Sequence, residues 1–248
     1  MRQHKVVGMS HILRGATLYS VVVILLWFAP MAHATPPTMP LPSRPAPDCN
    51  TERCIALTFD DGPGYYTPKL LDILRDHQIK ATFFLIGAKV PGDERVVRRM
   101  MRDGHEVGNH SFSHYEMTYL SPLDTYLEWW RAGTMIHNVT GYYPTIARPP
   151  YGAANNTTYE QMGRLGMSSI LWSVDPRDWA DKDSETVCQR IIHDTHPGAI
   201  ILLHDIHSTS VDAVPCVIEN LSAQDYQFVT VTELLGETQP GHAYRLRK

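Results

Sequence analysis

The chain has 248 residues, a length that suits one large domain and does not require a second. Its 22 basic and 26 acidic residues give a net charge of −4. A protein with this net charge lacks the excess of basic residues by which proteins bind nucleic acid or anionic lipid, so both classes of partner are excluded.

The first 34 residues have the features of an export signal. They contain three basic residues and no acidic one, an apolar run over 16–29, and the small-x-small pattern Ala-His-Ala at 32–34. This run is shorter than the roughly 20 residues that span a membrane, so we expect cleavage near Ala34 and no stable membrane anchor. The remaining chain has 19 basic and 26 acidic residues, a net charge of about −7. We therefore predict a protein that is secreted or held in the cell envelope.

Proline dominates the next segment, residues 35–50, with six prolines between positions 36 and 47. This composition favours extended polyproline conformations without a core, as in a tether. The sequence thus predicts a linker over 35–50, followed by one folded domain over 51–248.

From residue 54 onward, short apolar runs alternate with amphipathic segments, the pattern of strand–helix units around a largely parallel sheet. The predicted strands are 54–59, 81–86, 106–108, 145–148, 168–172, 199–203 and 227–231. The predicted helices are 68–77, 93–103, 122–139, 157–165, 184–194, 210–222 and 231–235. About seven such units predict an α/β fold, a distorted (β/α)7 TIM-like barrel, in which functional groups gather where strands end.

All four cysteines follow the predicted signal and would meet an oxidising compartment, which permits disulfides. Cys49 and Cys54 are close enough in sequence to link the N-terminus to the first strand. That leaves Cys188 and Cys216 to join two predicted helices. Four buried thiols are the alternative, and the wide spacing argues against a structural zinc site.

Two acidic residues, Asp60 and Asp61, follow the first predicted strand and precede a Gly-Pro turn. Adjacent acids at a strand end point in different directions, so one can bind a cation while the other acts as a base toward water. An ordinary acidic turn is the alternative.

His110 and His114 are four residues apart, a spacing that places both imidazoles on one side of a helical turn, within reach of one cation. They follow the predicted strand 106–108 and therefore lie at the same strand-end face as the two acids. One carboxylate and two imidazoles make three protein ligands and leave positions open, as in catalytic rather than structural metal sites. Surface histidines are the alternative.

The segment from Arg148 to Gly152 closes another strand, and its two prolines fix the direction of the amides that follow. We expect the backbone N–H of Tyr151 to stabilise an oxyanion and Arg148 to pair with a carboxylate, in particular Asp60. A rigid proline turn with a surface arginine is the alternative.

Polar groups also follow the strands 168–172 and 199–203. Trp179 can form the wall of an acyl pocket, and His204 can give a proton to a leaving group if an acid such as Asp178 keeps it protonated. The alternative is that His204 is a structural histidine at the end of the sheet, with its hydrogen bonds formed within the protein.

These five segments, together and in this order, resemble the signature motifs of the polysaccharide deacetylases, carbohydrate esterase family 4, whose fold is the NodB homology domain. The resemblance covers residues 54–235. It implies a divalent metal, usually Zn²⁺ with Co²⁺ as an option, bound by Asp61, His110 and His114.

The same resemblance implies a role for each remaining motif residue. Asp60 would be the catalytic base, oriented by Arg148, and His204 the catalytic acid, tuned by Asp178. The Tyr151 amide would donate to the oxyanion. Trp179 and Leu202 would line the acetyl pocket.

We therefore expect a hydrolase that removes acetyl groups from a polysaccharide partner, above all N-acetylglucosamine in peptidoglycan or a chitin-like glycan. Two alternatives stay open, an acetylxylan esterase with the same catalytic set and a non-catalytic glycan-binding protein. The sequence leaves the oligomeric state open.

Overall fold

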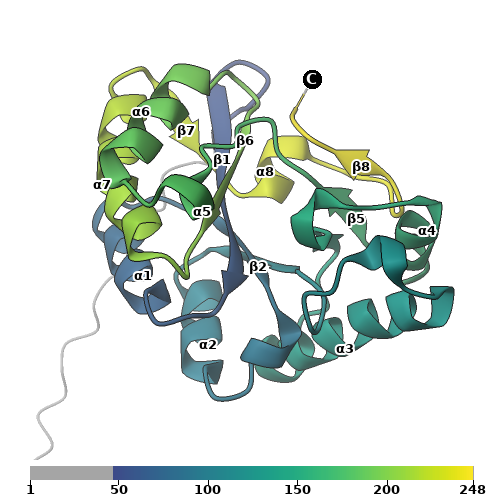
Figure 1. The fold of residues 1–248 in the computed structure, drawn as a ribbon. Coiled ribbons are helices and arrows are strands. Elements are labelled where there is room, and N and C mark those ends of the chain that lie inside the picture. The colour runs from purple at the N-terminus through teal and green to yellow at the C-terminus, as the bar shows by residue number, and fades with distance from the viewer. Residues whose placement is uncertain (1–46, 248) are drawn as a thin grey trace, which may run out of the picture. The chain divides into compact units, whose positions relative to one another are not determined.

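The computed structural model describes residues 47–247 (Figure 1). The predicted signal segment 1–34, its cleavage position and residues 35–46 of the predicted linker lie outside the described residues. The strands are β1 (Arg53–Gly62), β2 (Thr82–Leu85), β3 (Glu106–Asn109), β4 (Ile146–Ala147), β5 (Ser168–Ile170), β6 (Ile200–His204), β7 (Tyr226–Phe228) and β8 (Ala243–Tyr244).

Helices follow most of the strands, and three short 3₁₀ turns lie in loops. The α-helices are α1 (Thr67–Asp76), α2 (Glu94–Arg102), α3 (Pro122–Thr140), α4 (Asn156–Arg164), α5 (Asp178–Asp181), α6 (Ser184–Asp194), α7 (Ser208–Ser222) and α8 (Val231–Leu235). The 3₁₀ turns are η1 (Gly87–Lys89), η2 (Met117–Tyr119) and η3 (Pro150–Gly152). Among residues 47–247, no helix has both the length and the apolar character needed to cross a membrane.

The strands pair in the order β6-β1-β2-β3-β4-β5-β8, all through parallel ladders, and β7 pairs with the first residues of β1. Beyond β5, Val174 forms a parallel bridge to Ile201 of β6, and near the C-terminus Leu246 bridges to Ala199. These contacts bring the two sides of the sheet together as a distorted barrel. The predicted fold class is thus confirmed, and each of the seven predicted strands overlaps an observed one.

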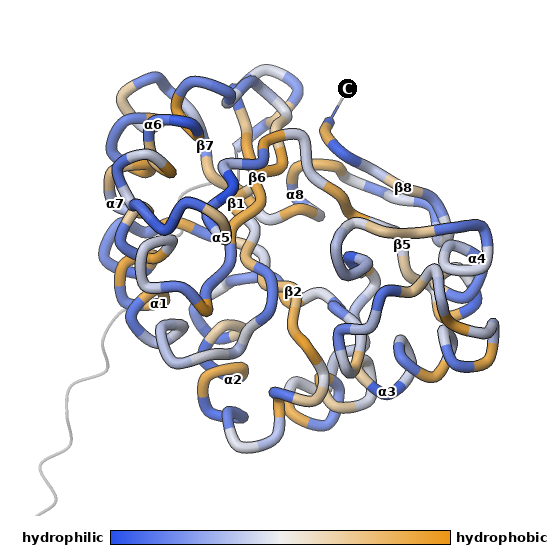
Figure 2. Tube along the Cα trace, viewed as in Figure 1, coloured by the Kyte–Doolittle hydropathy of each residue, from blue (hydrophilic) through white to orange (hydrophobic). Residues whose placement is uncertain are grey.

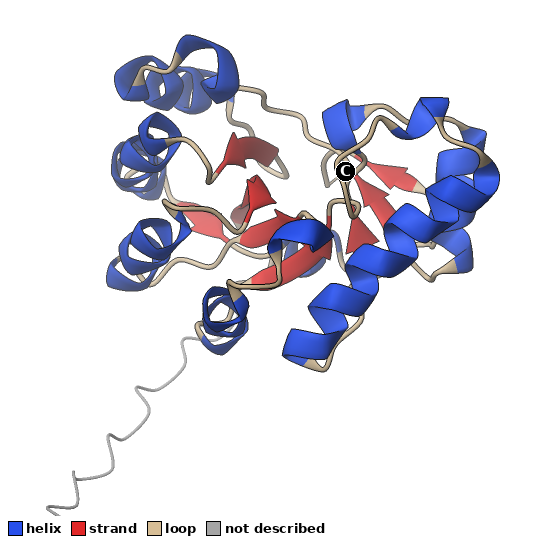
Figure 3. Cartoon of the chain, turned by 60° about the horizontal axis from the view of Figure 1, so that its bottom comes forward, coloured by secondary structure: helices blue, strands red, loops and turns tan. Residues whose placement is uncertain are grey.

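Side chains of β1 alternate between the two sides of this barrel. Ile55, Leu57 and Phe59 belong to a large apolar cluster shared with α1, α2, α6 and α7, whereas Ala56 belongs to a smaller cluster with Phe84, Ile146, Ile170 and Ile200. Strands β1, β2 and β6 are largely hydrophobic along their length (Figure 2), and the helices lie outside the strands (Figure 3). Because successive strand residues point to opposite faces, Thr58 and Asp60 share the inner side with Ala56.

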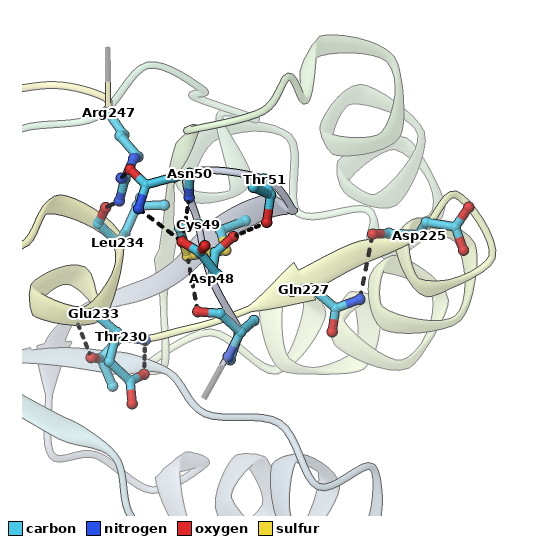
Figure 4. Close-up of a disulfide and its surroundings, with 12 residues drawn as sticks. Asp48, Cys49, Asn50, Thr51, Asp225, Gln227, Thr230, Glu233, Leu234 and Arg247 are labelled. Carbon is cyan, nitrogen blue, oxygen red and sulfur yellow. Dashed lines mark hydrogen bonds between the residues drawn. A yellow bond between two sulfur atoms is a disulfide. The ribbon is translucent and has the colours of Figure 1, made fainter. Parts of the chain in front are cut away.

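Two disulfides fasten the domain, and both predicted pairings are confirmed. Cys49 pairs with Cys54 at the start of β1, and Cys188 of α6 pairs with Cys216 of α7. Near the first bridge, Arg247 donates to Asn50 Oδ1 at 2.7 Å, which fastens the end of the chain to residues just before β1 (Figure 4).

Candidate active site and metal centre

The polar groups that the sequence predicts as functional collect at the carboxyl ends of the barrel strands. The acidic pair lies at the end of β1, and His204 at the end of β6. His110 directly follows β3, Arg148 directly follows β4, and α5 begins at Asp178 in the connection after β5. This is the face on which barrel enzymes carry their active sites.

Asp61, His110 and His114 offer one ligand atom each within 4.8 Å of one another. Asp61 Oδ1 lies 3.3 Å from His110 Nε2 and 3.0 Å from His114 Nε2. Neither approach forms a hydrogen bond, so this buried oxygen has no hydrogen-bond partner in the described part of the chain. Two ring nitrogens converging on an unsatisfied carboxylate oxygen fit the ligand set of a divalent cation.

The nearby imidazoles also affect the titration of the carboxylate. Burial raises the pKa of Asp61, but His110 and His114 together outweigh burial and hold that pKa well below its ordinary range. The group is therefore ionised at neutral pH, the form in which a carboxylate binds a metal.

The backbone around the two histidines differs from the helical turn that their spacing suggested. Residues 110–114 form an irregular loop in which Ser111 and His114 have positive φ values of 64° and 62°. Glu128 of α3 stabilises this loop by accepting hydrogen bonds from the amides of Phe112 and Ser113, at 3.0 and 2.8 Å. The two imidazoles converge because a distant helix fixes the loop, and the prediction of a helical turn is wrong.

His110 is oriented from behind by a main-chain carbonyl. Its Nδ1 lies 2.7 Å from Arg148 O, and since a carbonyl only accepts, Nδ1 carries the proton. In the neutral imidazole, the form that binds a metal, the lone pair of Nε2 then faces Asp61. A second hydrogen bond of this kind is usual for metal-binding histidines, because it fixes both the tautomer and the ring direction.

Asp60 is held apart from this triad by a buried guanidinium. Arg148 donates at 2.8 Å to Asp60 Oδ1, and also to Thr58 Oγ1 and to the carbonyls of Ile170 and Leu171. The other oxygen, Asp60 Oδ2, lies 3.8 Å from His110 Nε2. The predicted contact between Arg148 and Asp60 is therefore present, and it leaves one carboxylate oxygen beside the metal ligands.

His204 is paired with a fully buried carboxylate. Its Nδ1 lies 2.9 Å from Asp178 Oδ1, and its amide donates to Asp178 Oδ2 at 2.8 Å. Ser210 Oγ donates to the same Oδ2 at 2.6 Å. Burial lowers the pKa of His204, but Asp178, with Asp60 and Asp61 further off, outweighs burial and raises that pKa to about 9. This imidazole is protonated at neutral pH.

The hydrogen bonds of the turn at Tyr151 leave its main-chain amide unused. Tyr151 has φ 60° and ψ 6°, and the hydrogen bonds of the turn use the amides of Gly152 and Ala153. Within the residues described, none of these bonds uses the amide of Tyr151. Its ring stands edge-on to His114 at a centroid distance of 4.8 Å. The residue that carries the predicted oxyanion donor therefore lies beside the candidate metal ligand His114.

One pocket of about 410 Å³ brings these groups together. Its lining consists of Asp60, Asp61, His114, Tyr151, Trp172, Asp175, Trp179, Leu202, His204 and His207. Trp179 and Leu202 were expected there, whereas Trp172, Asp175 and His207 were not assigned from the sequence. Asp175 stands in the same Asp-Pro-Arg-Asp-Trp segment as Asp178, and this shared loop was the available signal. Asp205, to which no role was assigned from the sequence, is completely buried against Gly62 at the end of β1.

Residues 48–170 match the family model described as polysaccharide deacetylase. The chain belongs to this family, carbohydrate esterase family 4, and the resemblance seen in its motifs is confirmed.

Curated relatives and solved structures agree with this assignment. The peptidoglycan-N-acetylglucosamine deacetylase PgdA of Listeria monocytogenes is 40% identical over 192 residues, covering 77% of this chain and 41% of that protein. A peptidoglycan-N-acetylglucosamine deacetylase of Bacillus cereus is 38% identical, covering 75% of this chain and 90% of that protein. The structure of peptidoglycan deacetylase PdaC from Bacillus subtilis is 41% identical, with a TM-score of 0.71, covering 75% and 91% of the two chains. The chain thus spans about two fifths of PgdA and most of the B. cereus relative.

Proposed function

We propose that this protein is a metal-dependent hydrolase that removes the N-acetyl group from N-acetylglucosamine in peptidoglycan. The observation that carries the proposal is the shared pocket, which contains Asp61 and His114 of the metal triad, Asp60 and His204. Family membership supports the chemistry, and the names of the relatives from L. monocytogenes and B. cereus support this substrate.

The metal that we propose is Zn²⁺, with Co²⁺ as the second option. Asp61, His110 and His114 would hold it, because one carboxylate and two imidazoles leave coordination positions open. Bound there, a divalent cation supplies Lewis-acid polarisation of the acetyl carbonyl and lowers the pKa of water.

Asp60 acts in this proposal as the general base. Arg148 occupies Oδ1, so Oδ2 is the oxygen that accepts the proton of the attacking water. The guanidinium fixes the direction of the Asp60 carboxylate, while the second oxygen stays beside His110. Arg148 is therefore a positioning residue for the base.

His204 acts as the general acid. Its pKa near 9 keeps it protonated at neutral pH, and Nε2 gives this proton to the departing amine. Asp178 binds both the amide and the Nδ1 of His204. It therefore positions the imidazole and stabilises its positive charge.

The remaining roles concern the acetyl group itself. The free amide of Tyr151 donates to the oxyanion that forms when water attacks the carbonyl. Trp179 and Leu202 form the apolar wall that receives the methyl group, and Leu202 is only 4% exposed.

We also propose that the protein acts outside the cytoplasm, either secreted or in the cell envelope. The sequence predictions of an export signal over 1–34, a linker over 35–50 and a catalytic domain over 51–248 support this location. The two disulfides agree with an oxidising compartment.

Acetate and free amine released from three substrates test the function. We expect zinc-loaded protein to release both in equal amounts from peptidoglycan, faster than from acetylated chitooligosaccharides, with no activity on acetylxylan. Acetate release from acetylxylan alone would instead establish an O-acetyl esterase. A zinc-bound protein that releases no acetate from any of the three, while still binding them, would be a glycan-binding protein.

A further inference from the structure

Asp205 is a fully buried carboxyl that has no part in the roles proposed above. It directly follows His204, and its side chain lies against the end of β1 and the first residue of α1. A Cβ atom built on Gly62 would be 2.5 and 2.7 Å from its two carboxyl oxygens. The carboxyl group therefore packs directly on the backbone of the residue that follows Asp61.

A short hydrogen-bond chain connects this carboxyl to the same loop. Thr67 Oγ1 donates to Asp205 Oδ2 at 2.5 Å and accepts from the amide of Gly64 at 2.8 Å. Asp205 and Thr67 are both completely buried, so water does not compete for these bonds. The end of β1 is thus supported at Gly62 by packing, and the loop after it is supported at Gly64 through Thr67.

The loop needs this support because of the backbone conformation of Asp61. Its φ is 71°, in the left-handed region, which is unfavourable for residues other than glycine. Such a conformation persists only where the surroundings over-determine it. A relaxed Asp61 would turn its carboxylate away from His110 and His114, whose nitrogens lie within 3.3 Å of Oδ1.

We infer that Asp205 is a positioning residue for the metal centre: through Gly62 and the Thr67–Gly64 hydrogen bonds it holds Asp61 in the ligand conformation. This inference rests on the proposed function, since it takes Asp61 as a metal ligand. Groups behind metal ligands commonly change metal affinity by roughly 10- to 100-fold when they are removed.

The test measures zinc affinity of the folded, metal-free protein by competition with a chromogenic chelator, without reference to activity. We expect Asp205→Ala to weaken zinc binding by roughly 10- to 100-fold. Asp205→Asn keeps the shape and one acceptor oxygen for Thr67, so it should restore most of the affinity. Thr67→Val removes the donor of the same hydrogen bond and should also weaken zinc binding. This variant tests the inference even if Asp205→Ala does not fold.

Ser210→Ala is the matched control, because it also removes a buried hydrogen bond to a carboxylate, but on the His204 side. It should leave zinc affinity unchanged. Zinc affinities of Asp205→Ala and Thr67→Val equal to that of the wild type, with only a lower melting temperature, would show a purely structural role and overturn the inference. A wild-type protein that binds no zinc would overturn the metal site of the proposed function as well, a distinct result.

Discussion

Asp60 of β1 and His204 of β6 are register partners on adjacent parallel strands. Partners in a parallel ladder point to the same face of the sheet, so the proposed base and the proposed acid reach one pocket from neighbouring strands. Each is held from behind by its own partner, Arg148 for the carboxylate and Asp178 for the imidazole. The two proton-transfer groups are therefore independently fixed and can be tested separately.

Replacing Asp60 with asparagine should abolish turnover while leaving the metal in place. The new side chain would still accept a hydrogen bond from Arg148, but an amide cannot take the proton of water. We expect kcat to fall by roughly 10²- to 10⁴-fold, the usual contribution of a general base. Acetate release and zinc content of the purified variant are the measurements.

The matched variant is Asp61→Asn, which changes the neighbouring carboxylate in the same way. It should lose zinc as well as activity. Zinc content therefore distinguishes the proposed ligand, Asp61, from the proposed base, Asp60. Wild-type turnover by Asp60→Asn at full zinc content would remove Asp60 from the mechanism.

Activity should decline at alkaline pH as His204 loses its proton. The pKa of His204 is about 9, and a bound cation offsets the charge of Asp61, so the alkaline limb of kcat/KM should lie at or below pH 9. In Asp178→Asn the main cause of the raised pKa is gone and burial remains, which moves the limb to lower pH. If the alkaline limb of Asp178→Asn lay at the same pH as that of the wild type, His204 would not be the general acid.

The same pair makes stability depend on pH in the metal-free protein. The pKa of His204 is raised above its ordinary 6.5, so its contribution is fully present below pH 6.5 and is lost as pH rises through about 9. On this basis the contribution is on the order of 3 kcal/mol. Measured by urea unfolding, the loss of unfolding free energy caused by Asp178→Asn should be larger at pH 6 than at pH 10. An equal loss at both pH values would contradict the raised pKa of His204.

Zinc should stabilise the folded protein through the triad. At free zinc 100 times the dissociation constant, a site present only in the folded state adds about 2.7 kcal/mol. The melting temperature of wild type should therefore rise with zinc and fall after chelation, whereas His114→Ala should show almost no rise. His193→Ala, which changes an exposed histidine away from the pocket, is the control and should respond like wild type.

The two disulfides should differ in their effect on stability. Cys188–Cys216 closes a separation of 28 residues and Cys49–Cys54 one of 5. Loop-closure entropy then gives about 3.6 kcal/mol for the first and about 2 kcal/mol for the second. Two double Cys→Ala variants, one for each disulfide, measure these contributions as losses of unfolding free energy in urea. A greater loss for the Cys49–Cys54 pair would contradict this entropic account.

The fold was predictable where local pattern determines it. Each predicted apolar run overlaps a strand, because seven buried strands require such runs. Strand β8 and helix α5 were not predicted, since both are short and neither stands in an apolar run of the sequence. The closing bridge between Val174 and Ile201 depends on contacts between distant segments.

The site was predictable in its residue types and less so in its geometry. Motif order placed the acids and histidines at strand ends, and the structure brings them to one pocket, where His110 lies next to the lining residues Asp61 and His114. The positive φ at Ser111 and His114 was not predictable, because Glu128 on α3 stabilises that loop. The buried position of Asp205 depends likewise on packing against Gly62.

Arg148 is fully buried, and the carboxylate that neutralises it is Asp60. Loss of one member of such a pair typically costs roughly 3–5 kcal/mol, because the other charge is left without a partner. Loss of His114 removes only the stabilisation that bound zinc would supply, whereas a change at Asp60 also leaves the buried guanidinium of Arg148 without its counter-charge. In descendants that no longer carry out the reaction, Asp60 and Arg148 should persist together or disappear together.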